Sequence, residues 1–341
     1  MFLFVNPPPL SAEESHKSAF QRIKDLDIIG ALLFMPAIVC LLLALQWGGN
    51  EHAWNSSRII GLLVGFGVII IIFIAWQLHL GDDAMVPPRI LKQRTVASAC
   101  LFTLTFGGSV FILMYYLPIF LQSVRGSSAT KAGIQLLPVM VASVVSSITS
   151  GVGVATTGYY TPWLMGSNAI YAVGVGILMH YFTSSLTNPQ LIGLQALVGL
   201  GTGAGFQVPV IAVQTVLSME DVAIGSAAVV FFQNLGGALF VSVGQSVFQN
   251  GLLDSLSEKA PSLDPDIVLH GGATGIRTIL QNIGQMGQLG AVVESYVDGL
   301  QMSYQASLGL AVAAFVATFF LEWKSVKKGT QEKDSQVVMA V

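Results

Sequence analysis

Uncharged polar side chains inside long apolar segments are the residues of this sequence best placed to do chemistry. An amide or hydroxyl in an apolar medium must find a hydrogen-bond partner or water, because leaving it unpaired is costly. Each such residue could therefore make a hydrogen bond between helices, or line a water-filled cavity that binds a neutral or amphiphilic solute. Both interpretations stay open for Tyr115, Tyr116, Asn168, Gln195, Gln207, Gln214, Gln233, Asn234 and Gln245.

Two places in the sequence favour the cavity interpretation. Gln207 and Gln214 are seven residues apart, so they share one face of a helix. Pro209 lies between them and frees a backbone carbonyl, because proline lacks the N–H that would bond it. This combination is our first candidate for a cavity wall. Gln233 and Asn234, which directly precede two glycines, are the second.

Metal and cysteine chemistry has little support. The histidines at 16, 52, 79, 180 and 270 are scattered, and no HxxxH or CxxC spacing occurs. Cys40 and Cys100 both fall in apolar segments, which indicates inert buried thiols. We therefore predict no metal, no cofactor and no enzymatic activity. The net charge of −3 and the position of basic residues at segment edges also argue against a nucleic-acid partner.

A lipid bilayer is the simplest explanation for the charge pattern. Hydrophobic residues make up 53% of the chain, and no Asp, Glu, Lys or Arg occurs from Ala132 to Met219. A charge at the centre of a membrane helix costs about 2.5–3.5 kcal/mol. The sequence predicts an all-α polytopic membrane protein with eight transmembrane helices: Ile28–Gln46, Ile59–His79, Val96–Leu121, Ala132–Ala155, Trp163–Phe182, Leu191–Leu217, Ala223–Phe248 and Tyr304–Trp323.

The loops predict an orientation. The long connection at 249–303 has apolar residues at helical spacing, among them Ile276 and Leu280, and should contain an amphipathic helix at the surface. If successive spans cross the membrane in alternating directions, this loop lies on the outer side. Arg58, Arg125, Lys131, Lys259 and Arg277 lie on that side too. The other side holds Lys17, Arg22, Lys24, Arg89, Lys92, Arg94, Lys324, Lys327, Lys328 and Lys333. The second side is richer in Lys and Arg, so we expect both termini in the cytosol.

Glycines within the spans are candidates for helix packing or for a hinge. Membrane helices associate through small residues that let their backbones approach. The pairs Gly199/Gly203 and Gly201/Gly205 are four residues apart, and Gly236 is followed by Gly237; Pro209 joins this group. Static packing is one interpretation. The other is that these faces let helices slide or rock during transport.

Several short runs together resemble a known family. They are YYLPIFLQ at Tyr115–Gln122, RGSSA at Arg125–Ala129, GIQLLP at Gly133–Pro138, GYYTP at Gly158–Pro162, GLGTGAGFQVP at Gly199–Pro209 and FQNLGGA at Phe232–Ala238. Their order and spacing resemble the fungal fourteen-helix drug:proton antiporters of the major facilitator superfamily, which export drugs and mycotoxins. The resemblance covers roughly residues 2 to 323.

The resemblance also implies that the chain is a C-terminal portion. Residues 1–27 would be a remnant of a preceding helix, with Phe2–Pro9 as its tail, plus a cytoplasmic loop. Residues 28–95 would be the family's central two-helix segment. Residues 96–248 and 304–323 would form a C-terminal six-helix half-bundle, and 324–341 a cytoplasmic tail. The missing N-terminal half normally holds the proton-coupling acids, which is consistent with the absence of carboxylates from the predicted spans.

The implied function is efflux of small amphiphilic organic molecules across the plasma membrane, with the bilayer and a small-molecule substrate as partners. Alternating access needs two bundles that rock around a site between them. The missing N-terminal half-bundle would therefore be needed for transport. The alternative is a non-transporting remnant or a structural membrane subunit.

Overall fold

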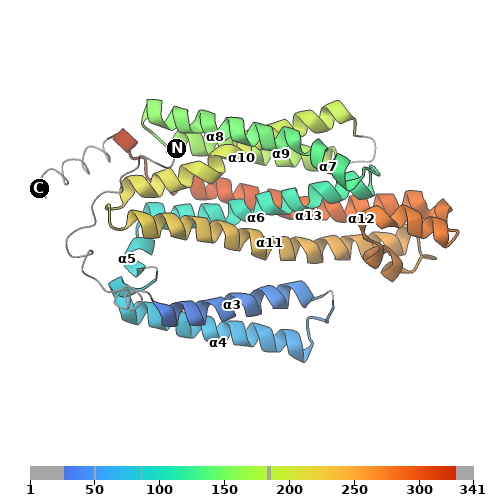
Figure 1. Cartoon of the computed structure of the whole chain (residues 1–341), viewed down its shortest axis with the longest axis horizontal. Coiled ribbons are helices and arrows are strands. Elements are labelled where there is room, and N and C mark those ends of the chain that lie inside the picture. Colours follow the sequence, from blue (N-terminus) through green and yellow to red (C-terminus); the bar gives the residue numbers. More distant parts are fainter. Residues whose placement is uncertain (1–26, 50, 86, 183–185, 328–341) are drawn as a thin grey trace, which may run out of the picture.

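A computed structural model describes residues 27–327, except residues 50, 86 and 183–185 (Figure 1). The expectations for the segment at 1–26 and for the end of the tail at 328–341 lie outside the described residues. In the described part, eight helices are long and apolar enough to cross a membrane. The predicted all-α architecture and the number of spans are confirmed.

The long helices follow one another with short connections. They are α3 (Ile28–Trp47), α4 (Ser57–Leu80), α6 (Arg94–Ser123), α8 (Leu137–Thr157), α9 (Thr161–His180), α10 (Asn188–Val216), α11 (Val222–Lys259) and α13 (Leu289–Thr318). The shorter elements are η1 (Gly81–Asp83), α5 (Pro88–Leu91), α7 (Ala129–Gln135), α12 (Pro265–Asn282) and η2 (Met286–Gln288).

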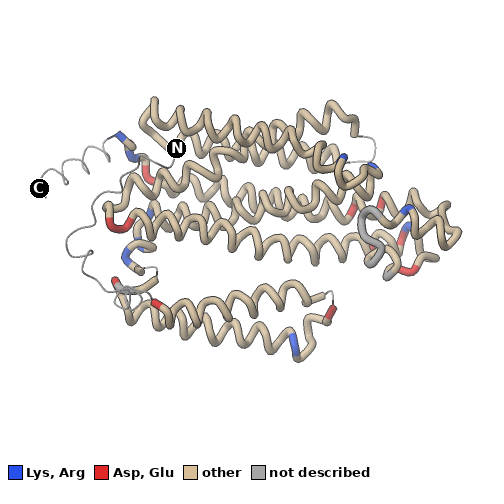
Figure 2. Tube along the Cα trace, in the orientation of Figure 1, with Lys and Arg blue, Asp and Glu red and all other residues tan. Residues whose placement is uncertain are grey.

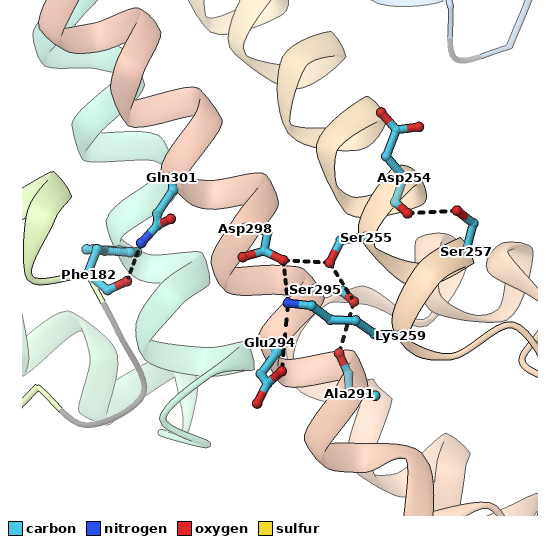
Figure 3. Close-up of polar contacts among 10 residues, drawn as sticks. All are labelled: Phe182, Asp254, Ser255, Ser257, Lys259, Ala291, Glu294, Ser295, Asp298 and Gln301. Atoms are coloured by element: carbon cyan, nitrogen blue, oxygen red, sulfur yellow. Dashed lines mark hydrogen bonds and ion pairs between the residues drawn. The ribbon is translucent and has the colours of Figure 1, made fainter.

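Two helices differ from the sequence prediction. Helix α11 continues to Lys259, and α13 begins at Leu289 and ends at Thr318, well before Trp323. Charges of the two extensions lie next to each other: Lys259 Nζ is 2.6 Å from Asp298 Oδ2 and 3.7 Å from a carboxylate oxygen of Glu294 (Figure 3). The last helices therefore do contain carboxylates, in the parts that extend beyond the predicted spans.

A helix is present in the long connection, where the apolar spacing predicted one. Ile276 and Leu280 of α12 are buried in the hydrophobic core, whereas Ile283, just after the helix, is exposed. The hydroxyl of Tyr296 in α13 donates a hydrogen bond to the carbonyl of Val268, 3.3 Å away. Helix α12 is thus fixed against the bundle by its apolar face.

The six helices α6, α8, α9, α10, α11 and α13 lie side by side as one bundle, and the α3–α4 hairpin lies beside α11 (Figure 1). Within the bundle, α10 packs against α8 and α9, and α6 packs against α11 and α13. The hairpin contacts the bundle in part through Phe34 and Phe231, whose ring centroids are 5.2 Å apart.

The six glycines singled out from the sequence all lie at helix contacts. A Cβ atom at Gly199 or Gly203 would overlap the backbone of α8. One at Gly201 would overlap Tyr171 of α9, and one at Gly205 would overlap Phe106 of α6. Gly236 and Gly237 contact Leu104 and Phe111 of α6 in the same way, and Pro209 is buried inside α10. The contacts explain why these positions need glycine; a hinge role stays a prediction.

Polar contacts hold the hairpin together and connect it to the bundle. The carboxylate of Asp27 accepts hydrogen bonds from the backbone N–H of Gly30 (2.7 Å) and the indole N–H of Trp76 (2.9 Å), which joins α3 to α4. The guanidinium of Arg89 donates to both carboxylate oxygens of Asp221, at 2.7 and 2.9 Å, and to Asp82 at 2.9 Å.

Arg89 therefore connects three elements: η1 at the end of the hairpin, α5, and the start of α11. Its hydrogen bonds lower the pKa of Asp221 below the usual range. Because the aspartate pKa is lowered, the stability that the Arg89–Asp221 pair contributes is fully present above the ordinary aspartate pKa. It is lost only as the pH falls through the lowered pKa. The link is thus intact at neutral pH.

The glycine contacts predict different effects of one substitution at two sites of α10. Gly203→Ala should destabilise the chain by about 1–3 kcal/mol, because the new methyl group overlaps the α8 backbone. Gly193→Ala is the matched control, since nothing lies within 4 Å of a Cβ there. Thermal unfolding in detergent measures both. Equal melting temperatures for the two variants would contradict the packing role.

Because Arg89 connects the hairpin to α11, we predict that Arg89→Gln weakens the contact between the α3–α4 hairpin and the bundle. The measurement is oxidative cross-linking between cysteines introduced at Phe34 and Phe231, with Cys40 and Cys100 replaced by alanine. Loss of the bidentate pair should lower the cross-linking rate about twofold or more. Arg58→Gln is the control, because Arg58 contacts only His52 among the described side chains. An unchanged rate in Arg89→Gln would show that the link does not hold the hairpin.

Candidate functional site

The structure divides the nine polar candidates by their exposure. Tyr115 is 50% exposed, and Gln207, Gln214 and Asn234 are also exposed. Tyr116, Asn168, Gln195 and Gln233 are buried inside the bundle, and Gln245 is half-buried. The sequence could not separate these groups, because neighbours in the chain such as Tyr115 and Tyr116 point to different sides of one helix.

The exposed group comes from three helices that contact one another, α6, α10 and α11. Gln207 and Gln214 lie on one exposed stripe of α10, together with Gly193 and Leu200 at the same seven-residue spacing. The amide nitrogen of Gln214 lies 3.5 Å from the hydroxyl of Ser226 in α11. We call the surface formed by Tyr115, Gln207, Gln214 and Asn234 the amide face.

Aromatic rings lie next to the amides on this face. Phe111 of α6 and Phe206 of α10 are each more than one-third exposed. Phe206 packs edge-on against Phe106, with ring centroids 5.6 Å apart, and Phe111 contacts Gly237 of α11. Between Arg94 and Ser123, and throughout α10, the sequence has no further charged residue. Such a surface can bind an uncharged or amphiphilic molecule through dispersion and a few hydrogen bonds.

The buried group contacts neighbouring helices. The amide nitrogen of Asn168 in α9 donates to the carbonyl of Ala311 in α13, 3.3 Å away. The backbone of Gln233 in α11 lies against Gly107 of α6. The ring of Tyr116 packs against Phe248, with centroids 5.5 Å apart. For Asn168, an interhelical hydrogen bond is therefore what the structure shows.

One polar cluster was missed by the sequence reasoning. The hydroxyl of Ser109 in α6 lies 2.9 Å from the hydroxyl of Tyr171 in α9 and 2.9 Å from that of Ser307 in α13. Serine gives little signal in a sequence, because its hydroxyl can bond the backbone of its own helix. Only the three-dimensional arrangement shows that these residues meet.

The described residues contain no group of three or more His, Cys, Asp or Glu side chains placed to hold a metal ion. Cys40 is half-buried and Cys100 is buried, and neither is in a disulfide.

Comparison with known proteins identifies the family. A family model described as the fungal trichothecene efflux pump (TRI12) matches residues 1–265. An MFS-type efflux pump of Trichophyton rubrum is 46% identical over 306 residues, which cover 90% of this chain and 56% of that protein. The aspyridones efflux protein of Neocamarosporium betae is 42% identical over 96% of this chain and 57% of its own length. The chain thus spans little more than half the length of these relatives.

The fold agrees with a solved transporter. The crystal structure of a bacterial homologue of the human lysosomal transporter Spinster, in an inward-facing and occupied conformation, aligns with a TM-score of 0.53. The alignment covers 79% of this chain and 59% of that one, at 18% sequence identity. The family model and the sequence relatives together show that this chain belongs to the fungal efflux pumps of the major facilitator superfamily, which are membrane transporters and not enzymes.

Proposed function

We propose that this chain forms the C-terminal half of a pump that exports small amphiphilic organic molecules, and that the amide face is the wall of its substrate cavity. The amide face itself is the main support. Its two glutamines come from α10, its asparagine from α11 and its tyrosine from α6, and further aromatic rings lie beside them. The printed names of the relatives, which include toxin and metabolite efflux proteins, fit the same activity.

The amide face differs from the surfaces that suit lipid. The exposed large side chains of α8, such as Val144, Ile148 and Val152, are apolar. The hydroxyl of Thr149 on the same side donates to its own helix, at the carbonyl of Val145. Amides such as Gln207 cannot be satisfied by lipid tails. Water or a second protein surface must therefore cover the amide face.

A second six-helix bundle is the proposed cover. Two bundles that enclose a central cavity would place the amide face against water and substrate, and rocking of one against the other would alternate access. The relatives are long enough to contain such a bundle, because the matched part is only 56–57% of their length. By this proposal the chain does not transport by itself.

Substrate recognition would depend on shape, stacking and hydrogen bonds. A glutamine amide both donates and accepts, so the face can bind carbonyl or hydroxyl groups of an uncharged substrate. The sequence places no Asp or Glu in α6, α8, α9 or α10. The carboxylates of α11 and α13 lie outside the predicted spans, and Asp298 is paired with Lys259. By this proposal, a carboxylate that couples export to protons would belong to the other bundle.

The charge distribution supports an orientation. Figure 2 shows basic residues at both ends of the structure. Alternating the eight spans over the full sequence assigns ten Lys and Arg residues to the side of Arg89, Lys92 and Arg94, and five to the side of Lys259. We assign the side of Arg89 to the cytosol, following the preference of Lys and Arg for that side. Both termini would then be cytosolic. Export from the cell further suggests the plasma membrane.

Transport measurements test the proposed cavity wall. The chain is joined to the preceding part of the Trichophyton rubrum pump and expressed in yeast without its own drug pumps; efflux of rhodamine 6G is measured. Gln207→Ala with Gln214→Ala should lower efflux about three- to tenfold, because hydrogen bonds to substrate are lost. Protein abundance should not change. Gln281→Ala, on an exposed position of α12, is the control.

Two results would contradict this proposal. One is normal efflux by the double variant. The other is efflux that falls only in proportion to protein abundance, which would mean that the glutamines serve packing. The chain expressed alone should not lower dye accumulation below that of cells with an empty vector.

Thiol labelling tests the orientation. A cysteine at Gln281 should react with a membrane-impermeant maleimide added to intact cells. A cysteine at Lys92 should react only after the cells are permeabilised. Both positions are exposed, so a difference reports the side of the membrane. Labelling of the Lys92→Cys variant in intact cells would overturn the assigned orientation.

A further inference from the structure

A buried group of hydroxyls holds the end of one tyrosine ring. The hydroxyl of Tyr171 in α9 lies 2.9 Å from that of Ser109 in α6. Ser109 donates to the carbonyl of Ser307 in α13 at 2.7 Å, and the hydroxyl of Ser307 donates back to the carbonyl of Ser109 at 2.9 Å. All three residues are fully buried. Because the two serines are fixed to each other, the hydroxyl of Tyr171 has a fixed partner.

Two phenylalanine rings connect Tyr171 to the amide face. The ring of Tyr171 meets that of Phe106 in α6 with centroids 5.2 Å apart and an interplanar angle of 61°. Phe106 in turn meets Phe206 of α10 with centroids 5.6 Å apart and an interplanar angle of 76°. Phe106 is fully buried, whereas Phe206 is 37% exposed and directly precedes the exposed Gln207. These contacts lead from a buried hydroxyl to a ring on the amide face.

Glycines of α10 bring the two buried rings close to the helix that carries the exposed one. A Cβ at Gly201 would lie 2.4 Å from the backbone of Tyr171, and one at Gly205 would lie 2.2 Å from Phe106 Cζ. The ring of Phe106 also stacks on Phe102 of its own helix, with centroids 5.2 Å apart. Close-packed interiors transmit strain. A shift of the Tyr171 ring would therefore reach the exposed ring through Phe106.

We propose that the pump takes planar aromatic molecules that stack on the ring of Phe206, and that Tyr171 is a positioning residue that holds this ring through Phe106. The inference rests on the proposed function of the amide face. Aromatic rings attract one another in offset-stacked or edge-on arrangements, which depend on orientation. A ring that is already held in place loses less freedom when a substrate binds. Tyr171 would thus affect substrate affinity without touching the substrate.

A purely structural role of Tyr171 gives a different result. If its hydroxyl only joined helices, its loss would lower stability and abundance, but the pump molecules that fold would bind substrate as before. Tyr304 of α13 is the matched control, because it is also fully buried and its ring packs against Phe182, with centroids 4.6 Å apart.

Transport kinetics test the positioning role, with rhodamine 6G as the planar aromatic probe. The chain joined to the preceding part of the Trichophyton rubrum pump is assayed in inside-out membrane vesicles. Tyr171→Phe should raise KM about two- to fivefold and leave kcat unchanged, because only substrate binding is weakened. Tyr304→Phe should change neither. Phe206→Leu should raise KM at least as much as Tyr171→Phe, and Phe206→Tyr, which keeps the ring, should restore most of the lost affinity.

Double variants show whether Tyr171 acts through Phe206. In a Phe206→Leu background, Tyr171→Phe should add little to KM, because the ring that it positions is gone. Phe111 belongs to the same face but contacts Gly237 of α11, so the effects of Phe111→Leu and Tyr171→Phe should multiply. An unchanged KM in Tyr171→Phe, or effects that multiply with Phe206→Leu, would overturn the positioning role.

Failure of the proposed function is distinguishable from failure of this inference. Normal efflux in the variant with Gln207→Ala and Gln214→Ala would remove the amide face from transport. Reduced efflux there, together with an unchanged KM in Tyr171→Phe, would reject the positioning role alone.

Fluorine NMR of the full chain in detergent gives an answer that does not depend on transport. With 4-fluorophenylalanine incorporated at position 206, Tyr171→Phe should shift or broaden the fluorine signal, and Tyr304→Phe should leave it unchanged. A signal that is the same with and without the Tyr171 hydroxyl would show that the hydroxyl does not hold the exposed ring, and would overturn the inference.

Discussion

The need to satisfy hydrogen bonds in an apolar medium determines most of this structure. Lipid tails offer no donors or acceptors, so each polar side chain in a span must bond its own helix, a neighbouring helix, water or a ligand. The Thr149 hydroxyl bonds its own helix, and the Asn168 amide bonds a neighbouring helix. On the amide face, Gln214 bonds Ser226 of the neighbouring helix α11, and Asn234 donates to the carbonyl of Val230 in its own helix. The exposed amide of Gln207 extends the same polar surface. This grouping of exposed amides is the basis of our proposal that the amide face lines the substrate cavity.

Close packing at glycine complements this constraint. Gly205 lets α10 approach Phe106 of α6, and Gly236 lets α11 approach the backbone of α6. These contacts fix α6, α10 and α11 beside one another, and the amide face exists only because they do. The ion pair of Arg89 with Asp221 connects the α3–α4 hairpin to the start of α11. Close packing at glycine thus holds the bundle helices together, and one ion pair connects the α3–α4 hairpin to them.

Much of the fold could be predicted from the sequence because hydropathy and charge report directly on lipid contact. The spans, the seven-residue spacing of Gln207 and Gln214, and the glycine contacts followed from such patterns. The ends of α11 and α13 did not, because Lys259 and Asp298 neutralise each other across helices that are distant in the chain. The exposure of Tyr115 and the burial of Tyr116 also depend on rotation of α6 within the bundle. Sequence spacing does not give that rotation, and neither could it show the meeting of Ser109, Tyr171 and Ser307.

Water access to the amide face tests the central claim most directly. Single cysteines at Gln207 on α10 and at Ile148 on the apolar side of α8 can be compared in the chain joined to the preceding part of a relative. The rate of reaction with a small polar maleimide is measured with and without a transported dye. If the amide face lines a cavity, the cysteine at Gln207 reacts much faster than the one at Ile148, and the dye slows it. Equal, slow rates at both positions would place the amide face in lipid and contradict the account.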